Sequence, residues 1–257
     1  MLAQREAPAS ETGGWDQKEM SFTEHLRELR KRLLISFGTV IVLAVALFWP
    51  AQHIIPWMAQ AYFHGVRLHA FGPADVIFTE FKLSIYMAIV LGLPVILYQV
   101  WMFIVPAFHP RTRHMVYAYV APSIVLAAIG IAFAHFVVLP RVVHALLSIT
   151  SAVAEPTFGI ESTLNFILIL LLAFALIFQT PVVMLALARI GIINSLMLRK
   201  YRKHAIFGFF VFGAIIAPDG NPLTMALIAG PMYVLYEISL WIIAVLEKSW
   251  RAERASY

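Results

Sequence analysis

The sequence predicts an all-α integral membrane protein with six transmembrane helices, and two features of its composition indicate this class. Of the 257 residues, 61% are hydrophobic and only 13% are charged, whereas soluble proteins carry about 25% charged residues. The mean hydropathy is +0.82. The charged residues cluster between long apolar runs, and a helix needs about 20 apolar residues to cross the hydrocarbon core. Lipid is therefore the expected solvent.

Six apolar runs are the predicted spans, and Glu237 is the single charged residue inside any of them. The runs cover residues 33–49, 83–105, 115–139, 164–188, 205–217 and 223–246. The fifth run would form a helix only about 20 Å long, and the sixth is also short if Glu237 stays near water or a partner. Prolines lie inside four runs and predict kinks, which favour a concave bundle. These prolines are Pro94, Pro122, Pro181 and Pro231.

The distribution of Lys and Arg predicts that both termini are cytoplasmic. Segments 1–32, 106–114, 189–204 and 247–257 hold six, two, five and three of these residues, whereas the three remaining connections hold only three together. Positive residues accumulate on the cytoplasmic side of membrane proteins. We expect residues 1–20, which are polar, to form a disordered cytoplasmic tail, and residues 247–257 to form a second cytoplasmic tail.

No motif for catalysis or for a cofactor is present in the sequence. There is no Cys, no Walker A motif, no GxGxxG and no GxSxG, so neither an enzyme nor a bound cofactor is predicted. His135 is the only histidine inside a predicted span, and no H-E-x-x-H pattern occurs, so no metal site is predicted. The net charge is +5, and the basic residues that produce it lie beside the spans. This position favours contact with membrane lipid rather than nucleic acid.

Residues 21–32 have the pattern of an amphipathic helix that runs into the first span. Glu24, Glu28 and Arg32 share one face at i, i+4 spacing. Two interpretations remain open at this point. The helix is either a surface helix with salt bridges whose basic end anchors the topology, or its carboxylates bind an arginine through charge-assisted hydrogen bonds.

Three polar residues stand within the apolar runs and need partners. Gln99 lies among interfacial aromatic residues at the end of the second run, and Gln179 lies two residues before Pro181 in the fourth. Polar groups inside a membrane face the bundle interior or a cavity, where they contact other helices or serve a function. Glu237 is interpreted as a structural partner or as a proton-accepting group, because a buried carboxylate is costly unless paired or protonated.

Four segments together resemble TatC, the multispanning subunit of the twin-arginine protein translocase. Residues 25–32 are similar to its H-L-x-E-L-R-x-R signature, and further agreement is found at residues 94–103, 136–140 and 230–237. The resemblance covers residues 21–246 in order. It implies a six-helix, glove-shaped receptor in the bacterial cytoplasmic membrane that recognises folded proteins with twin-arginine signal peptides, driven by the proton-motive force.

The resemblance also implies partners and site residues. The implied partners are signal peptides, single-span TatA/TatB-type subunits, other TatC copies and lipid. The implied signal-peptide-binding residues are Glu28, Glu24, His25, Leu26, Arg30, Gln99, Phe103 and Thr112. The implied contacts to partner subunits or between polar groups in the membrane are Gln179, Pro181, Asn221 and Glu237.

Three positions depart from the family pattern, because Thr112, Gln179 and Asn221 stand where members often carry an acid. Glu28 is therefore expected to carry most of the arginine recognition. Two alternatives are a small-solute or ion transporter, which would need polar groups converging from several spans, and a TatC paralogue that reads signal peptides weakly.

Overall fold

The computed structural model describes residues 22–62, 68–104, 117–151, 157–217 and 221–255, and these residues are almost entirely helical. The predicted tail at residues 1–20 and Thr112 lie outside the described residues. The elements are α1 (Phe22–Tyr62), β1 (Leu68–His69), α2 (Asp75–Ile104), α3 (Tyr117–Phe133), the π-helical turn η3 (Ala134–Val138), α4 (Leu139–Ser151), β2 (Phe158–Gly159), α5 (Ile160–Ile177), α6 (Thr180–Arg189), α7 (Ser195–Ile216) and α8 (Pro222–Ala255).

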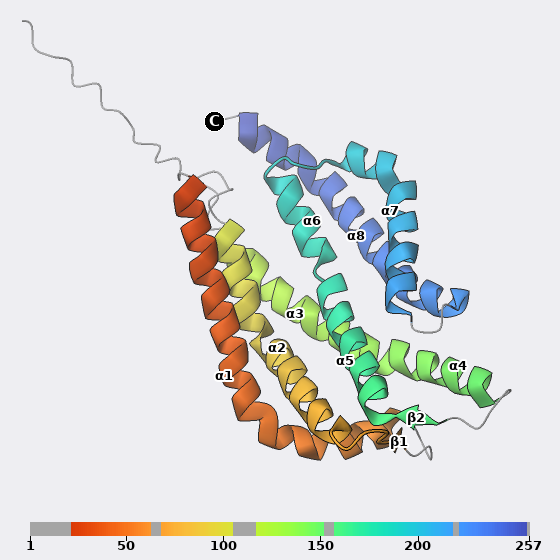
Figure 1. Cartoon of the computed structure of the whole chain (residues 1–257). Helices are drawn as coiled ribbons and strands as arrows, with labels where there is room; N and C mark the ends of the chain where they lie inside the picture. Colours follow the sequence, from red (N-terminus) through yellow and green to blue (C-terminus); the bar gives the residue numbers. More distant parts are fainter. Residues whose placement is uncertain (1–21, 63–67, 105–116, 152–156, 218–220, 256–257) are drawn as a thin grey trace, which may run out of the picture.

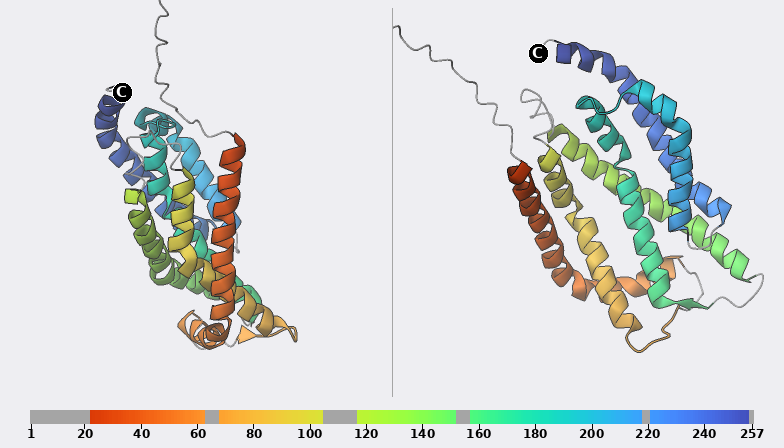
Figure 2. Two further views of the ribbon diagram at one scale, coloured as in Figure 1. Left: turned by 90° about the vertical axis from the view of Figure 1, so that its left-hand side faces the viewer. Right: turned by 45° about the horizontal axis from the view of Figure 1, so that its top comes forward.

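The arrangement of the helices places α1 and α2 side by side at one edge of the bundle and α7 and α8 at the other (Figures 1 and 2). The N-terminal end of α1, the α6–α7 connection and the C-terminal end of α8 lie at one end (Figure 1). At the opposite end β1 and β2 pair in parallel, with Leu68 opposite Phe158. One end of the bundle therefore collects the basic segments of the chain.

Five helical segments of the described chain are long and apolar enough to cross a membrane. They are Thr23–Tyr62, Asp75–Ile104, Ala118–Ser148, Ile160–Arg189 and Pro222–Trp250. The predicted span 205–217 falls in the second half of α7, whose first half contains Arg199, Lys200, Arg202 and Lys203. The apolar part of α7 is thus short, and the count of six spans stays a prediction.

Helix α1 is longer than the predicted span, because it continues past residue 49 to Tyr62 and bends near Pro50 (Figure 1). Proline lacks the N–H that would bond to the carbonyl four residues earlier, and its ring crowds that carbonyl. Beyond the bend, Ala51, Ile55 and Met58 are buried at helical spacing, with Tyr62 one turn further on. Residues 50–62 are therefore part of the helical bundle, whereas the apolar runs predict only a connection between spans at 50–82.

The predicted span 164–188 is two helices, α5 and α6, separated at Phe178 and Gln179. Pro181 cannot donate a hydrogen bond to the carbonyl of Ile177, so the regular pattern stops there. The Gln179 amide bonds instead to the Leu176 carbonyl at 2.9 Å, three residues earlier. The proline therefore produces a break rather than a smooth kink.

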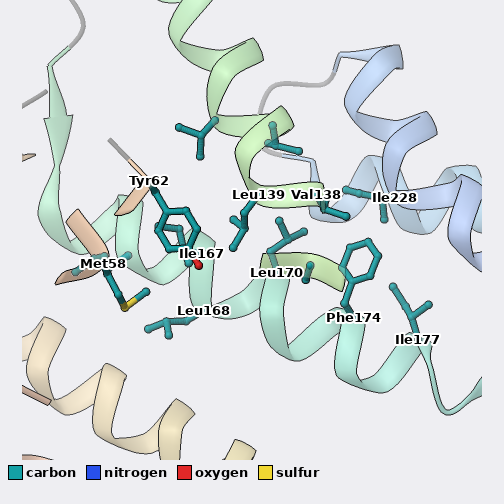
Figure 3. Close-up of a cluster of buried hydrophobic side chains, with 14 of the residues drawn as sticks. Met58, Tyr62, Val138, Leu139, Ile167, Leu168, Leu170, Phe174, Ile177 and Ile228 are labelled. Carbon is teal, nitrogen blue, oxygen red and sulfur yellow. The ribbon is translucent and has the colours of Figure 1, made fainter. Parts of the chain in front are cut away.

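The core is centred on α5, whose Ile167, Leu170 and Phe174 are fully buried. Figure 3 shows these side chains against Val138 and Leu139 from η3 and α4, with Met58 and Tyr62 of α1 beside them. The Tyr62 hydroxyl is also hydrogen-bonded to His135 Nδ1 in η3. The bent end of α1 is thus held onto the central helices.

Close helix crossings depend on two glycines. A Cβ on Gly130 of α3 would lie 2.5 Å from the Phe174 carbonyl oxygen of α5, and a Cβ on Gly213 of α7 would lie 2.9 Å from the Met225 carbonyl oxygen of α8. Glycine has no Cβ, so it permits such backbone approach.

Candidate functional site

The first turns of α1 and the last turns of α2 together form a polar site. Arg32 Nε donates to Glu28 Oε1 at 3.0 Å, and Arg32 Nη2 donates to the same oxygen. Arg32 Nη1 donates to Gln99 Oε1 of α2 at 3.2 Å. The side chains of Glu28 and Arg32 are each 19% exposed, so this ion pair is partly shielded from solvent.

The second oxygen of the Glu28 carboxylate differs from the first. Glu28 Oε2 is buried and accepts no hydrogen bond from the residues that the structure describes. A carboxylate has about four lone-pair sites for donors, and here all the protein donors lie on Oε1. The carboxylate is therefore only half satisfied.

An aromatic contact lies beside the ion pair. The His25 ring of α1 stacks on the Phe103 ring of α2, with ring centroids 4.4 Å apart and planes inclined by 23°. Four residues of the predicted signal-peptide set are therefore brought together, two from each helix, across about 75 residues of sequence. They are His25, Glu28, Gln99 and Phe103.

The other predicted residues on α1 lie at the surface. Glu24, Leu26 and Arg30 are exposed on the same turns. A shallow hollow beside them is lined by Arg27, Arg30, Lys31, Leu34 and Ile35. The carboxylate of Glu28 is thus bordered by positive charge.

Arg32 is the member of the site that the sequence analysis did not assign. Its i, i+4 spacing to Glu28 was visible in the sequence, and such pairs interact on a helix surface. Its bond to Gln99 joins residues 67 positions apart, and no local pattern predicts that contact.

A second polar group links three helices around Gln179. Gln179 Nε2 donates to the Ser123 carbonyl of α3 at 2.9 Å and to the Ala175 carbonyl of α5 at 3.5 Å. Trp101 Nε1 of α2 donates to Ser123 Oγ at 2.8 Å. Gln179 is 8% exposed, Pro181 beside it is buried, and Gln179 Oε1 accepts no hydrogen bond within the described part of the chain.

Glu237 is paired with Arg202, which connects α8 to α7. Arg202 Nη2 donates to Glu237 Oε2 at 2.9 Å, and Arg202 Nε lies 2.7 Å from Glu237 Oε1. Asn221 Oδ1 accepts from the Leu223 amide at 2.9 Å at the start of α8. Both predicted residues therefore have structural contacts in the α7–α8 pair.

Another polar contact holds the C-terminal end of α8. Glu247 is 7% exposed and accepts from the Ser195 amide at 3.1 Å and from Ser195 Oγ at 2.5 Å, at the start of α7. The Arg189 guanidinium lies 5.4 Å from the centre of the Trp250 ring. The predicted tail at 247–257 is thus helical to Ala255, and its first residues pack against the α6–α7 connection.

The described residues contain no group of three or more His, Asp or Glu side chains that could hold a metal ion. The arrangement around Glu28 instead provides three features: a carboxylate that binds a guanidinium, the side-chain amide of Gln99, and an aromatic surface. Such a set is suited to recognition of a cationic, partly apolar segment.

Comparison with known proteins gives one consistent family. The family model described as "Sec-independent protein translocase protein (TatC)" matches residues 24–231. The chain is 35% identical to the TatC protein of Aquifex aeolicus over 228 residues, which covers 87% of this chain and 94% of that protein. It is 34% identical to TatCy of Bacillus subtilis over 226 residues, which covers 87% of this chain and 89% of that protein.

Solved structures agree with this family. A crystal structure of the twin-arginine translocase receptor TatC is similar with a TM-score of 0.77 at 34% identity, and the match covers 88% of this chain and all of that one. A second structure of the same receptor, in DDM, has a TM-score of 0.78. With its five long apolar segments, the chain is a multi-pass membrane protein, and it belongs to the TatC family of Sec-independent protein translocase proteins.

Proposed function

We propose that this chain is the receptor and core subunit of a twin-arginine translocase, and that Glu28 binds an arginine of the signal peptide at the cytoplasmic face. One observation carries the proposal. The Glu28 carboxylate already holds a guanidinium, that of Arg32, in a partly shielded position. A charge-assisted pair of this kind is stronger than a neutral hydrogen bond.

The surroundings of Glu28 support recognition of a signal peptide. The stacked rings of His25 and Phe103 provide an aromatic surface within one helical turn of the carboxylate, and Leu26 and Leu29 are exposed beside it. A twin-arginine signal peptide has a cationic segment followed by an apolar one. The site offers a partner for each.

The proposed membrane arrangement has six spans with both termini in the cytoplasm and a glove-like concave bundle. The apolar half of α7 is the fifth span, and because it is short, the bilayer is expected to thin locally beside α7 and α8. The basic residues of α7, from Arg199 to Lys203, then lie at the cytoplasmic surface. The chain is placed in the bacterial cytoplasmic membrane.

The proposed partners are TatA/TatB-type single-span subunits, other TatC copies and membrane lipid. The surface around Gln179 and Pro181 is the preferred contact for a single-span helix. Gln179 and Pro181 are themselves buried, so a partner helix would have to displace part of the packing around them to reach Gln179 Oε1, which has no donor in the described residues. The chain organises export driven by the proton-motive force, and it acts without an enzymatic step or a cofactor.

The transporter alternative gains no support from the geometry. A solute pathway would need polar groups that converge at mid-membrane. Gln179 instead bonds to α3 and α5, and Glu237 is paired with Arg202 of α7.

The test is export of a twin-arginine reporter by cells that carry Glu28→Gln as their only copy of this protein. Export is expected to be abolished while the protein still inserts at normal levels. The matched control is Glu80→Gln. It makes the same change near the start of α2, whereas the candidate site is formed by the last turns of that helix and the first turns of α1. Normal export with Glu28→Gln at normal protein levels would remove Glu28 as the arginine-binding residue.

Site-specific crosslinking from positions 24, 28 and 112 to a signal peptide distinguishes a signal-peptide receptor from a TatC paralogue that binds signal peptides weakly. A receptor crosslinks to a twin-arginine peptide and poorly to its twin-lysine version. A paralogue with weak signal-peptide reading crosslinks poorly to both, although it still assembles with partner subunits.

A further inference from the structure

We infer that Arg32 is an internal occupant of the arginine-binding carboxylate, and that a signal-peptide arginine binds Glu28 by taking the place of Arg32. The inference rests on the proposed function, since it takes the twin-arginine peptide as the ligand. It adds Arg32 as a residue that sets how tightly a peptide must hold Glu28 in order to bind. Arg32 acts through Glu28, and it competes with the peptide rather than binding it.

The first support is that the guanidinium of Arg32 is fully engaged by hydrogen bonds to residues of the same chain. Two of its guanidinium nitrogens donate to Glu28 Oε1, and the third donates to Gln99 Oε1. The carboxylate that holds Arg32 has one oxygen with two donors and one buried oxygen with none from the described residues. The site is thus occupied by a guanidinium that bonds to only one of the two carboxylate oxygens, which is weaker than the bidentate geometry.

The second support is that two guanidinium groups fit this carboxylate poorly at the same time. The strong arginine–carboxylate geometry uses two parallel hydrogen bonds, one to each oxygen. Here Oε1 is already engaged, and Oε2 is buried. The same turns of α1 also carry Arg27, Arg30 and Lys31, so an additional cation beside Arg32 would be repelled. Exchange removes the competition for Oε1, because only one guanidinium then bonds to the carboxylate.

The third support is that Arg32 has somewhere to remain after exchange. Its bond to Gln99 does not involve Glu28, so the displaced side chain keeps one partner on α2. Exchange breaks one ion pair and forms another of the same kind. The free energy of binding then comes mainly from the second arginine and the apolar segment of the peptide.

Exchange sets a threshold for binding. An incoming arginine replaces the planar fork of Arg32 with an equivalent fork, whereas a lysine ammonium offers a compact charge without that geometry. Both peptides must break the same Arg32–Glu28 pair, so this cost weakens both by the same factor. The lysine peptide, which forms the weaker pair, is the one that the threshold keeps from binding.

The experiment measures binding of fluorescent twin-arginine and twin-lysine signal peptides to the full-length protein in lipid nanodiscs. With Arg32→Gln, affinity for the twin-arginine peptide is expected to rise roughly threefold to tenfold, the scale of a partly exposed ion pair. Affinity for the twin-lysine peptide is expected to rise by a similar factor, because both peptides are released from the same competition. Lys31→Gln is the matched control, since it removes one charge from the exposed neighbour and should change both affinities much less.

Two results would overturn the inference. If Arg32→Gln lowers affinity for the twin-arginine peptide, Arg32 supports the site instead of competing for it. If Arg32→Gln raises affinity no more than Lys31→Gln does, the loss of one positive charge explains the change and no exchange takes place. Arg32→Lys keeps the positive charge and loses the fork, so it decides the question even if Arg32→Gln does not fold. It should raise affinity for the twin-arginine peptide, because the competing pair is weaker.

Failure of the proposed function gives a different pattern. In that case the unaltered protein binds both peptides equally, or Glu28→Gln leaves binding of the twin-arginine peptide unchanged. If both of those tests succeed while Arg32→Gln weakens binding, only the exchange is wrong.

Discussion

Two carboxylate–arginine pairs in this protein have similar chemistry and different positions in the fold. Glu28 and Arg32 are four residues apart on one helix, whereas Glu237 and Arg202 are 35 residues apart and join α8 to α7. Breaking the first pair leaves both residues on the same helix. Breaking the second removes a link between helices. A pair within one helix can therefore exchange partners at low cost, and a pair between helices cannot.

The two regions around these pairs differ in the same way. No residue in the most apolar stretch of α1 is buried. In the most apolar stretch of the segment Ile160–Arg189, by contrast, 61% of the residues are buried. The N-terminal site thus lies on a helix that packs mainly against α2 and leaves most of its surface uncovered. The proposed recognition site thus lies where few tertiary contacts would be disturbed.

The largest expected effect on stability is at the α3–α5 crossing. Gly130→Ala places a Cβ 2.5 Å from the Phe174 carbonyl oxygen, and overpacking of this kind costs about 1–3 kcal/mol. Gly38→Ala on α1 meets no atom within 4 Å and should be neutral or slightly stabilising. Thermal unfolding of the two variants in detergent measures the difference. Equal melting temperatures would contradict the contrast between the regions.

The next effect compares the two ion pairs directly. Glu237→Gln is expected to lower the free energy of unfolding by about 1 kcal/mol, since Arg202 loses its charged partner and both side chains are partly exposed. Glu28→Gln should change stability by less than about 0.5 kcal/mol. Unfolding titrations in mixed detergent check both values. The exchanged variant Glu237→Arg with Arg202→Glu should recover part of the loss, and no recovery would argue against a direct pair.

A similar effect is expected at the polar contact between α2, α3 and α6. Gln179→Leu removes the bond to the Ser123 carbonyl and also removes the buried Oε1 that has no donor in the described structure. These changes offset one another, so stability should shift by less than about 1 kcal/mol in either direction. Gln179→Ala also loses the packing contacts of the side chain beyond Cβ, so this variant should be clearly less stable than Gln179→Leu. The reverse order would show that the hydrogen bond outweighs the packing.

The smallest effect is at the start of α8. Asn221→Ala removes the side-chain acceptor for the Leu223 amide and should cost about 0.5–1 kcal/mol, as for other helix caps. Asn221→Asp keeps an acceptor and should stay close to the unaltered protein. Hydrogen exchange of the first turn of α8 is the measurement. Equal protection in both variants would mean that the cap contributes little.

Much of the fold follows from local patterns. Apolar runs, prolines and basic clusters predicted a helical membrane protein, and four of the predicted spans lie in the long apolar segments of α1, α2, α3 and α8. The 164–188 run falls within the apolar segment Ile160–Arg189, but the break at Gln179 was not predicted. The continuation of α1 to Tyr62 was missed as well, because its apolar spacing is interrupted by Gln52, His53 and two prolines.

The candidate site was partly predictable. Glu28 and its neighbours were selected by family resemblance and by i, i+4 spacing, while Gln99 and Phe103 were selected from a motif about 70 residues later. Their meeting depends on α1 and α2 packing side by side. Glu247 gave no usable signal, because an acid near the end of a predicted helix resembles any solvated charge.

By itself, the sequence determined the solvent of this protein, its helical class and the charge asymmetry of its ends, because hydropathy, proline geometry and positive charge act over a few helical turns. Only the tertiary structure decided which polar groups become partners. Arg32 meets Gln99, Gln179 meets Ser123 and Glu237 meets Arg202 across 67, 56 and 35 residues. Such contacts are set by how the helices pack, and packing depends on shape along whole helices rather than on any local pattern.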